Sequence, residues 1–240
     1  MALAHVHLIF LVSVKRHKVD QTIPVRSIME LGEQNWFGDV NPREIALVVD
    51  EFYTGEKASN LKEQLNNLLS NDSKTVNFDL AKLFYNVIFE NTSYAAIDLR
   101  GTSSALKLDL NNQLDITEQF DLVTNLGTAE HVFNQYHFFK NMHDLTKPGG
   151  LMLHTLPNQG GYDHGFYNYH PKFCFDLCEA NNYSPLSVVF TEGSGKTGKI
   201  TNIDRASYAK LVAENQLGRF SSLLVLLQKN SIESEFIIPT

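Results

Sequence analysis

Residues 26–35 read RSIMELGEQN, in which a short apolar run ends in Glu30 and Gly32 follows two places later. This order is typical of the first strand and turn of a nucleotide-type cofactor pocket in an α/β protein. A dinucleotide would require G-x-G-x-x-G next, because its pyrophosphate needs close backbone approach and a helix N-terminus. Here Glu33 and Gln34 follow Gly32, so neither the glycines nor the charge suits a pyrophosphate. The stretch therefore argues against a nicotinamide oxidoreductase.

The composition around this stretch is that of a globular protein. The chain has 240 residues, 43% of them hydrophobic and 20% charged, which is enough for one large α/β domain spanning residues 1–240. The formal net charge of −7 predicts no nucleic-acid partner. The two cysteines, Cys174 and Cys178, are too few for a disulfide framework, which predicts reduced thiols and a cytoplasmic protein.

Residues 1–18, MALAHVHLIFLVSVKRHK, superficially resemble a signal sequence. Their apolar run contains His7, is too short to cross a bilayer, and has its basic residues after the run rather than before it. We therefore expect an amphipathic helix over residues 3–18 that packs on the domain, and no membrane partner.

Strand and helix patterns alternate through the rest of the chain. Strands are expected at 25–30, 94–98, 106–108, 120–124, 151–156, 186–190 and 220–228, and helices at 45–52, 61–69, 80–89, 132–145 and 171–181. This alternation predicts a Rossmann-like, mostly parallel seven-stranded sheet with helices on both faces. No long helix precedes the last strand, so we expect that strand to be antiparallel.

Polar residues follow several of these strands directly. They are Glu30, Asp98, Asp109 and Asn125. Ligands of such sheets bind at the carboxyl ends of the strands, so these side chains are expected along one binding edge. Carboxylates suit the ammonium group and ribose hydroxyls of S-adenosylmethionine, which carries no phosphate and therefore needs no glycine cradle.

Five segments resemble motifs of the class I S-adenosylmethionine-dependent methyltransferases. They are ELGEQ (30–34), YAAIDLRG (94–101), LKLDL (106–110), FDLVTNLGTAEHV (120–132) and LTKPGGLMLHTLP (145–157). The resemblance implies that S-adenosylmethionine is the cofactor, with Asp98 on the ribose and Asp109 near the adenine. The cofactor-binding residues it implies are Glu30, Gly32, Gln34, Asp98, Leu99, Asp109, Leu110 and Asn125.

The chain departs from the family pattern in two places. Gln34 stands where the first motif has its last glycine. About sixty residues separate the first two strands, where one helix is usual, so residues 41–74 are expected to form an inserted helical cap. This insertion covers the substrate, mediates contacts of a homodimer, or does neither.

The segment GGYDHGFYNYHP (160–171) follows the fifth expected parallel strand and lies at the methyl-donor end of the pocket. It contacts the substrate or forms an aromatic plug that shapes the cofactor site. We expect His164 to be the catalytic base, with His131 as the second candidate, because histidine titrates near working pH. Tyr169 is expected to orient the acceptor.

Two other patterns resemble functional motifs without matching them. His131, His154, His164 and His170 show no compact metal-binding spacing, so no metal is expected. Residues 191–199, TEGSGKTGK, lack the spacing of a phosphate-binding loop and are expected to form a flexible loop or lid.

The predicted function is methyl transfer from S-adenosylmethionine to a small-molecule acceptor. A short likeness of residues 160–171 to loops of methyltransferases linked to sugars favours O-methylation of a sugar or related metabolite. The alternative is a catalytically inactive methyltransferase-like binding or assembly module, which the altered glycine motif favours.

Overall fold

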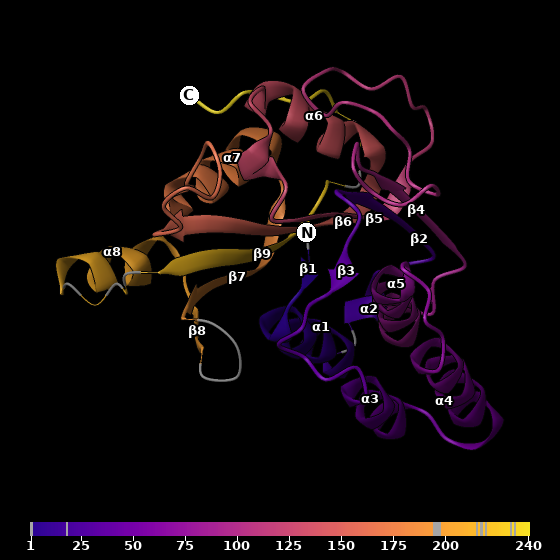
Figure 1. Ribbon diagram of the computed structural model, residues 1–240. Coiled ribbons are helices and arrows are strands. Elements are labelled where there is room, and N and C mark those ends of the chain that lie inside the picture. The colour runs from indigo at the N-terminus through magenta and orange to yellow at the C-terminus, as the bar shows by residue number, and fades with distance from the viewer. Residues whose placement is uncertain are drawn as a thin grey trace.

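The protein was analysed as a computed structural model (Figure 1). It describes residues 2–17, 19–193, 198–214, 220–230 and 234–240, together with residues 216, 218 and 232. Residue 18 of the expected N-terminal helix and residues 194–197 of the expected loop therefore lie outside the described residues. None of the helices in the described part of the chain is both long and apolar enough to cross a membrane.

A seven-stranded sheet with the order β4-β2-β5-β6-β9-β7-β8 forms the centre of the fold. Its strands are β2 (Ser27–Leu31), β4 (Ser93–Ile97), β5 (Phe120–Leu126), β6 (Thr146–Gln159), β7 (Ser184–Glu192), β8 (Lys199–Asn202) and β9 (Ser221–Gln228). The first four in spatial order are parallel, whereas β9 is antiparallel to both β6 and β7. The predicted fold class, including the antiparallel last strand, is confirmed.

Helices cover both faces of this sheet (Figure 1). One face carries α1 (His5–Arg16), α2 (Val19–Thr22), α3 (Glu44–Phe52), α4 (Gly55–Leu69) and α5 (Val76–Phe89), and the other carries α6 (Gln135–Leu145) and α7 (Pro171–Asn181). A further helix, α8 (Arg205–Ala213), lies near β7. Strand residues alternate between two apolar clusters, since Ile28 and Leu122 join α1 and α5 while Met29 and Val123 join α6 and α7.

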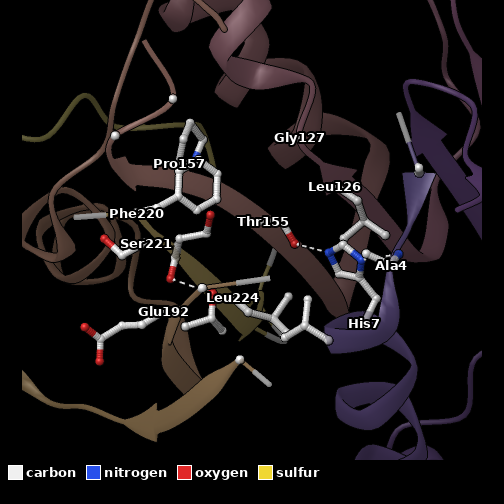
Figure 2. A pocket seen from close by; sticks show the side chains of 18 of the residues that line it. Ala4, His7, Leu126, Gly127, Thr155, Pro157, Glu192, Phe220, Ser221 and Leu224 are labelled. Carbon is white, nitrogen blue, oxygen red and sulfur yellow. Dashed lines mark hydrogen bonds between the residues drawn. The ribbon is translucent and has the colours of Figure 1, made fainter. Parts of the chain in front are cut away.

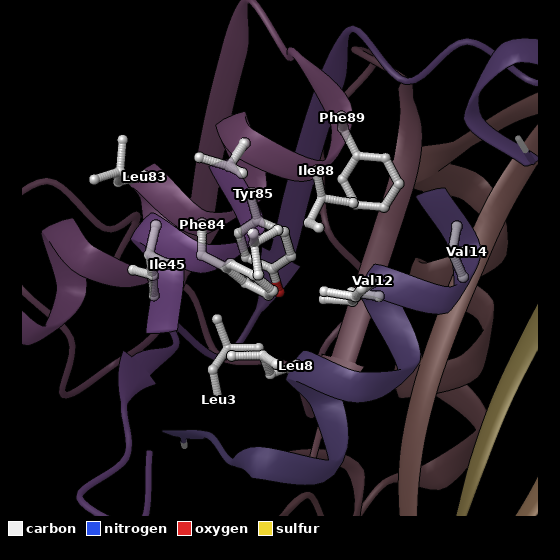
Figure 3. Packing of buried hydrophobic residues seen from close by; sticks show 14 of the residues in the cluster. Leu3, Leu8, Val12, Val14, Ile45, Leu83, Phe84, Tyr85, Ile88 and Phe89 are labelled. Atoms are coloured by element: carbon white, nitrogen blue, oxygen red, sulfur yellow. The ribbon is translucent and has the colours of Figure 1, made fainter. Parts of the chain in front are cut away.

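The first cluster is densely packed because α5 is apolar on most of its surface (Figure 3). Phe84 and Tyr85 are fully buried there, and Trp36 packs edge-on against Phe84 at a centroid distance of 5.5 Å. Leu8 and Val12 of α1 belong to the same cluster. This packing fixes the N-terminal helix beside the sheet.

The N-terminal segment starts with a strand rather than a helix. Ala2–Leu3 (β1) pairs in parallel with Asn35–Trp36 (β3), so α1 begins at His5 and not at residue 3 as expected. The helices α3 and α4 occupy the stretch expected as an insertion, and α5 connects them to β4. Trp36 and Gln34 follow Gly32 in an extended path, so the chain does not enter a helix directly after the first strand.

Two expected elements differ from the structure. The strand expected at 106–108 is wrong: Leu106 makes one isolated parallel bridge to Ile97, and Leu106, Lys107 and Leu108 are exposed. The backbone of 106–108 pairs with β4 only at Leu106, so it does not extend the sheet as a strand. The antiparallel β8 at the opposite edge is the seventh strand instead. The helix expected at 132–145 begins at Gln135, where the Asn134 side chain accepts from the His137 amide.

Candidate active site

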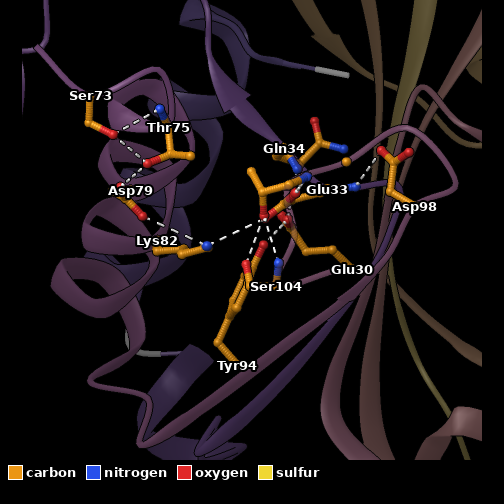
Figure 4. A network of polar contacts seen from close by, with 12 residues as sticks. Glu30, Glu33, Gln34, Ser73, Thr75, Asp79, Lys82, Tyr94, Asp98 and Ser104 are labelled. Carbon is orange, nitrogen blue, oxygen red and sulfur yellow. Dashed lines mark hydrogen bonds and ion pairs between the residues drawn. The ribbon is translucent and has the colours of Figure 1, made fainter. Parts of the chain in front are cut away.

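The carboxyl ends of β2 and β4 lie side by side, because Leu31 pairs with Ile97. Glu30 nevertheless points away from the open edge, toward α5 (Figure 4). It is fully buried, and its Oε2 accepts the Gln34 amide at 2.8 Å and the Tyr94 hydroxyl. Burial raises the pKa of Glu30 to about 7. The carboxyl therefore stabilises the turn after β2, and a direct bond from Glu30 to the cofactor stays a prediction.

The turn after β2 is closed by its own side chains. Gly32 has φ of 93°, which favours glycine, and its amide donates to the Ile97 carbonyl. Gln34 is fully buried, and its Nε2 donates a hydrogen bond to the Gly32 carbonyl at 2.8 Å. The larger residue at the position of the missing glycine is thus accommodated by folding back on the turn.

Glu33 ties this turn to the loop after β4 (Figure 4). It is 1% exposed, and its carboxylate accepts the Thr102 amide at 2.6 Å and the Thr102 hydroxyl at 2.9 Å. Lys82 of α5 lies 3.3 Å from Glu33 Oε1 and compensates the buried charge. The buried Glu33 carboxylate therefore holds the turn after β2 and the loop after β4 together.

Asp98 follows β4 and remains half-buried. One carboxylate oxygen accepts the Glu33 amide at 3.1 Å and the other accepts the Arg100 amide at 2.7 Å. Each carboxylate oxygen has two lone pairs, so both oxygens retain an acceptor site. Gly101 allows the loop after β4 to lie close to Glu33, since a Cβ on residue 101 would be 2.7 Å from Glu33 Oε2. The neighbouring Leu99 is exposed at this edge.

Asp109 and Leu110 lie beyond the Leu106 bridge, near the edge strand β4. Asp109 is exposed, and its Oδ1 accepts the amide and the side chain of Asn111, which lowers its pKa. Leu110 is buried in the α6 cluster. Asp109 follows this bridge by three residues, and the roles of Asp98 and Asp109 in cofactor binding stay predictions.

Asn125 at the end of β5 is fully buried on the α6 face. Its Oδ1 accepts the amides of Thr128 and Ala129, and its Nδ2 lies 3.3 Å from His154 Nδ1. The side chain thereby stabilises the short 3-10 helix η1 (Ala129–His131). Asn125 thus positions the residues after β5, and its predicted contact with the cofactor remains untested.

The buried polar atoms at these strand ends suit a cationic ligand without phosphate. Side-chain acceptors without a hydrogen-bond partner among the described residues include Gln34 Oε1 and Glu130 Oε2. An ammonium and a sulfonium supply the charge that such acceptors lack, whereas a pyrophosphate would repel them. The chain therefore fits S-adenosylmethionine better than a dinucleotide.

A cavity of about 760 Å³ adjoins this edge (Figure 2). It begins at Asn35 and Leu126, which follow Gln34 and Asn125 in the chain, and it extends over the ends of β6, β7 and β9. Its size is in the range of small-molecule sites. Of the predicted site residues, His131 and His164 line it, whereas the eight predicted cofactor residues are not among its described walls.

The N-terminal helix forms one wall of this cavity through His7, which sequence reasoning did not assign to the site. The Ala4 amide donates to His7 Nδ1 at 2.9 Å, so Nε2 carries the proton and donates to Thr155 Oγ1 at 2.9 Å (Figure 2). Burial lowers the pKa of His7 to about 4, which keeps the ring neutral. Only the folded chain brings residues 7 and 155 together.

A cluster of Glu130, His131 and His164 lies at the cavity wall near β5. Glu130 is 1% exposed, its Oε1 lies 3.3 Å from His164 Nε2, and burial raises its pKa. The two imidazole rings are 4.9 Å apart between centroids. The two predicted catalytic histidines are therefore neighbours, joined by a glutamate that sequence reasoning did not select.

Tyr169, the third predicted catalytic residue, packs in the α6 cluster instead. It is 6% exposed, its hydroxyl donates to Gln135 Oε1 at 2.6 Å, and it is not among the described residues that line the cavity. Its aromatic neighbours Phe139 and Phe173 account for its burial. We therefore leave Tyr169 out of the functional proposal below.

Comparisons with known proteins come from sequence and from structure. Residues 59–154 match the family model described as a methyltransferase domain, whereas no curated protein matches the chain. Similar structures include an N1-methyltransferase of Burkholderia thailandensis with 1,6-didemethyltoxoflavin and S-adenosylhomocysteine (10% identity, 93% of this chain and 78% of that chain, TM-score 0.46). The N-methyltransferase NodS of Bradyrhizobium japonicum with S-adenosylhomocysteine gives 13% identity, 92% and 85% coverage, and a TM-score of 0.46. Because these TM-scores lie below 0.5, we draw nothing further from them.

The matched residues extend from α4 to β6 and contain three of the five motifs in full and most of a fourth, at 145–157. The strands they form, β4, β5 and β6, lie with β2 in the parallel part of the sheet. Residues 59–154 therefore match a methyltransferase domain, which agrees with the methyltransferase resemblance and the S-adenosylmethionine cofactor expected from the sequence motifs.

Proposed function

We propose that the protein methylates a hydroxyl group of a small polar acceptor, such as a sugar or related metabolite, that binds in the cavity between α1 and the ends of β5, β6, β7 and β9. The observation that carries this proposal is the position of the cavity. It starts one residue beyond the predicted cofactor residues Gln34 and Asn125, and it ends at the Glu130–His131–His164 cluster.

The walls of the cavity favour an acceptor with both hydroxyl groups and apolar faces. Phe37 and Phe220 are half-exposed and line it from opposite ends of the chain. Residues with polar side chains, among them Gln159 and Ser222, also line the cavity. Aromatic faces and hydrogen-bonding groups together suit a polyhydroxylated ring.

The reaction requires that the acceptor lose a proton as the new C–O bond forms and the S–C bond breaks. S-adenosylmethionine supplies the electrophilic methyl group when it is bound. His164 takes the acceptor proton: Glu130 Oε1 accepts from its Nε2, which leaves Nδ1 as the basic nitrogen. The cavity walls orient the acceptor and exclude water, which is the main contribution expected of a methyltransferase.

Methyl transfer to a panel of sugars, polyols, carboxylates and amines tests the proposal. The readouts are release of S-adenosylhomocysteine and mass detection of the methylated product. His164→Ala should lower kcat by about 10²- to 10⁴-fold while leaving cofactor affinity by calorimetry unchanged. His170→Ala is the matched control, because His170 is exposed on the same loop but is absent from the described cavity walls. Equal loss in both variants would contradict the assignment.

A second candidate function is a methyltransferase-like binding module without activity. The observation that favours it is the turn after β2, where the side chains of Glu33 and Gln34 are bonded inside the protein. A rise in melting temperature with S-adenosylhomocysteine, combined with no transfer to any acceptor class, would support this second function.

A further inference from the structure

The Glu130–His131–His164 cluster is held together by backbone contacts as well as by side chains. Glu130 and His131 belong to η1 after β5, and His164 lies in the turn after β6. The Phe166 amide donates to the Glu130 carbonyl at 2.7 Å. A Cβ on Gly165 would lie 2.9 Å from that same carbonyl, so glycine is required for the two segments to approach so closely.

Further hydrogen bonds attach the loop after β6 to the segment after β5. The Tyr167 hydroxyl donates to the Phe133 carbonyl at 2.9 Å, and the Tyr169 hydroxyl donates to Gln135. These contacts fix His164 opposite η1 although 33 positions separate it from His131 in sequence. A prearranged set of side chains loses less conformational entropy when it binds a ligand.

The side chains present a set of metal ligands. One ligand atom from each of Glu130, His131 and His164 lies within 4.8 Å of the other two. Metal–ligand bonds of about 2.0–2.2 Å place neighbouring ligand atoms roughly 3–4 Å apart, so a small movement of the exposed histidine rings completes the geometry. Glu130 Oε2 is buried without a partner, as expected of a carboxylate that lacks its cation.

We propose that Glu130, His131 and His164 bind one divalent transition-metal cation, such as Zn²⁺ or Mn²⁺, at the wall of the acceptor cavity. Two imidazoles and one carboxylate suit these ions, whereas Mg²⁺ and Ca²⁺ prefer oxygen ligands alone. Three protein ligands leave further coordination positions open, which is typical of catalytic rather than structural sites. All three residues line the cavity, so an acceptor bound there would be within reach of the cation.

The catalytic part of this inference rests on the proposed function. An acceptor hydroxyl coordinated to the cation has a lowered pKa and releases its proton to water. Its oxygen would then attack the methyl group as the S–C bond breaks. In this metal-dependent mode His164 would be a ligand of the cation, and water would replace it as the acceptor of the proton. Removal of the ion with a chelator distinguishes proton removal by His164 from activation of the acceptor by the cation, because only activation by the cation requires the ion.

Titration of the full-length, chelator-treated protein with ZnCl₂ by calorimetry, and with MnCl₂ by electron paramagnetic resonance, tests the binding. We expect one ion per chain, and a loss of affinity of at least about 10-fold in His131→Ala and His164→Ala. His170→Ala should bind like the wild type. Both cluster histidines are exposed, so these variants are expected to fold, and circular dichroism checks this.

The absence of saturable binding, or equal binding by the wild type and both cluster variants, would overturn the site. Methyl transfer at full rate after removal of the ion would overturn its catalytic role. If no acceptor is methylated, the proposed function fails, but the metal titrations still decide whether the site exists.

Discussion

Glu30→Gln changes a group whose burial has a measurable consequence for stability. The carboxyl of Glu30 is fully buried, and its pKa is raised from 4.5 to about 7 mainly by desolvation. The folded protein therefore holds a proton on Glu30 at pH values where the unfolded chain has released it. Glutamine keeps a carbonyl oxygen for the Gln34 amide but does not titrate.

The sign of the effect follows from the raised pKa. The contribution of Glu30 is fully present below about pH 4.5, decreases as the pH rises, and is lost once the pH passes about 7. Each pKa unit corresponds to about 1.4 kcal/mol, so the shift predicts a loss of roughly 2–3 kcal/mol in unfolding free energy between pH 5 and pH 8. Glu30→Gln removes this loss.

Urea unfolding followed by circular dichroism at pH 5 and pH 8 measures the effect. The difference in unfolding free energy between Glu30→Gln and the wild type should change by roughly 2–3 kcal/mol in favour of the variant on going from pH 5 to pH 8. Glu63→Gln is the matched control, because Glu63 is exposed on α4 and should show no such change. A difference in unfolding free energy that does not vary with pH would refute the conclusion that burial raises the pKa of Glu30.

Three further predictions concern the cavity and the cofactor edge. His7 has a pKa lowered to about 4 by burial, so its contribution to stability should be full above about pH 6.5 and be lost as the pH falls through 4; His7→Gln, still able to donate to Thr155, should weaken that dependence in thermal melts. Gly101→Ala should cost about 1–3 kcal/mol in urea unfolding, because its Cβ would approach Glu33 to 2.7 Å, and unchanged stability would contradict that close contact. Asp98→Ala should reduce S-adenosylmethionine affinity by at least about 10-fold in calorimetry, and an unaltered affinity would remove Asp98 from the cofactor site.

Local sequence patterns were sufficient for most of the sheet and its helices. The apolar runs of β2, β4, β5, β6, β7 and β9 are long enough to be recognised without knowledge of their neighbours. The strand expected at 106–108 failed because a strand needs a partner along its length, and only Leu106 has one. β8 was missed because its residues are mostly exposed and show no apolar periodicity.

Some residues of the candidate site were likewise predictable from sequence, whereas others were not. The position of Asp98 at a strand end, and the choice of His131 and His164 as neighbours of the methyl-donor end, were available from order along the chain. The direction of Glu30, by contrast, depends on the pleat of β2, which turns alternate side chains to opposite faces and points this carboxyl at α5.

The sequence by itself determined that the chain forms a mostly parallel sheet, because apolar periodicity is a local property, and its motifs carried the resemblance to methyltransferases. Only the tertiary structure decided that His7 of the cavity wall bonds to Thr155 and that Glu130 lies against His164. Those contacts connect segments far apart in the chain, and packing of whole elements, rather than local sequence, determines which side chains meet.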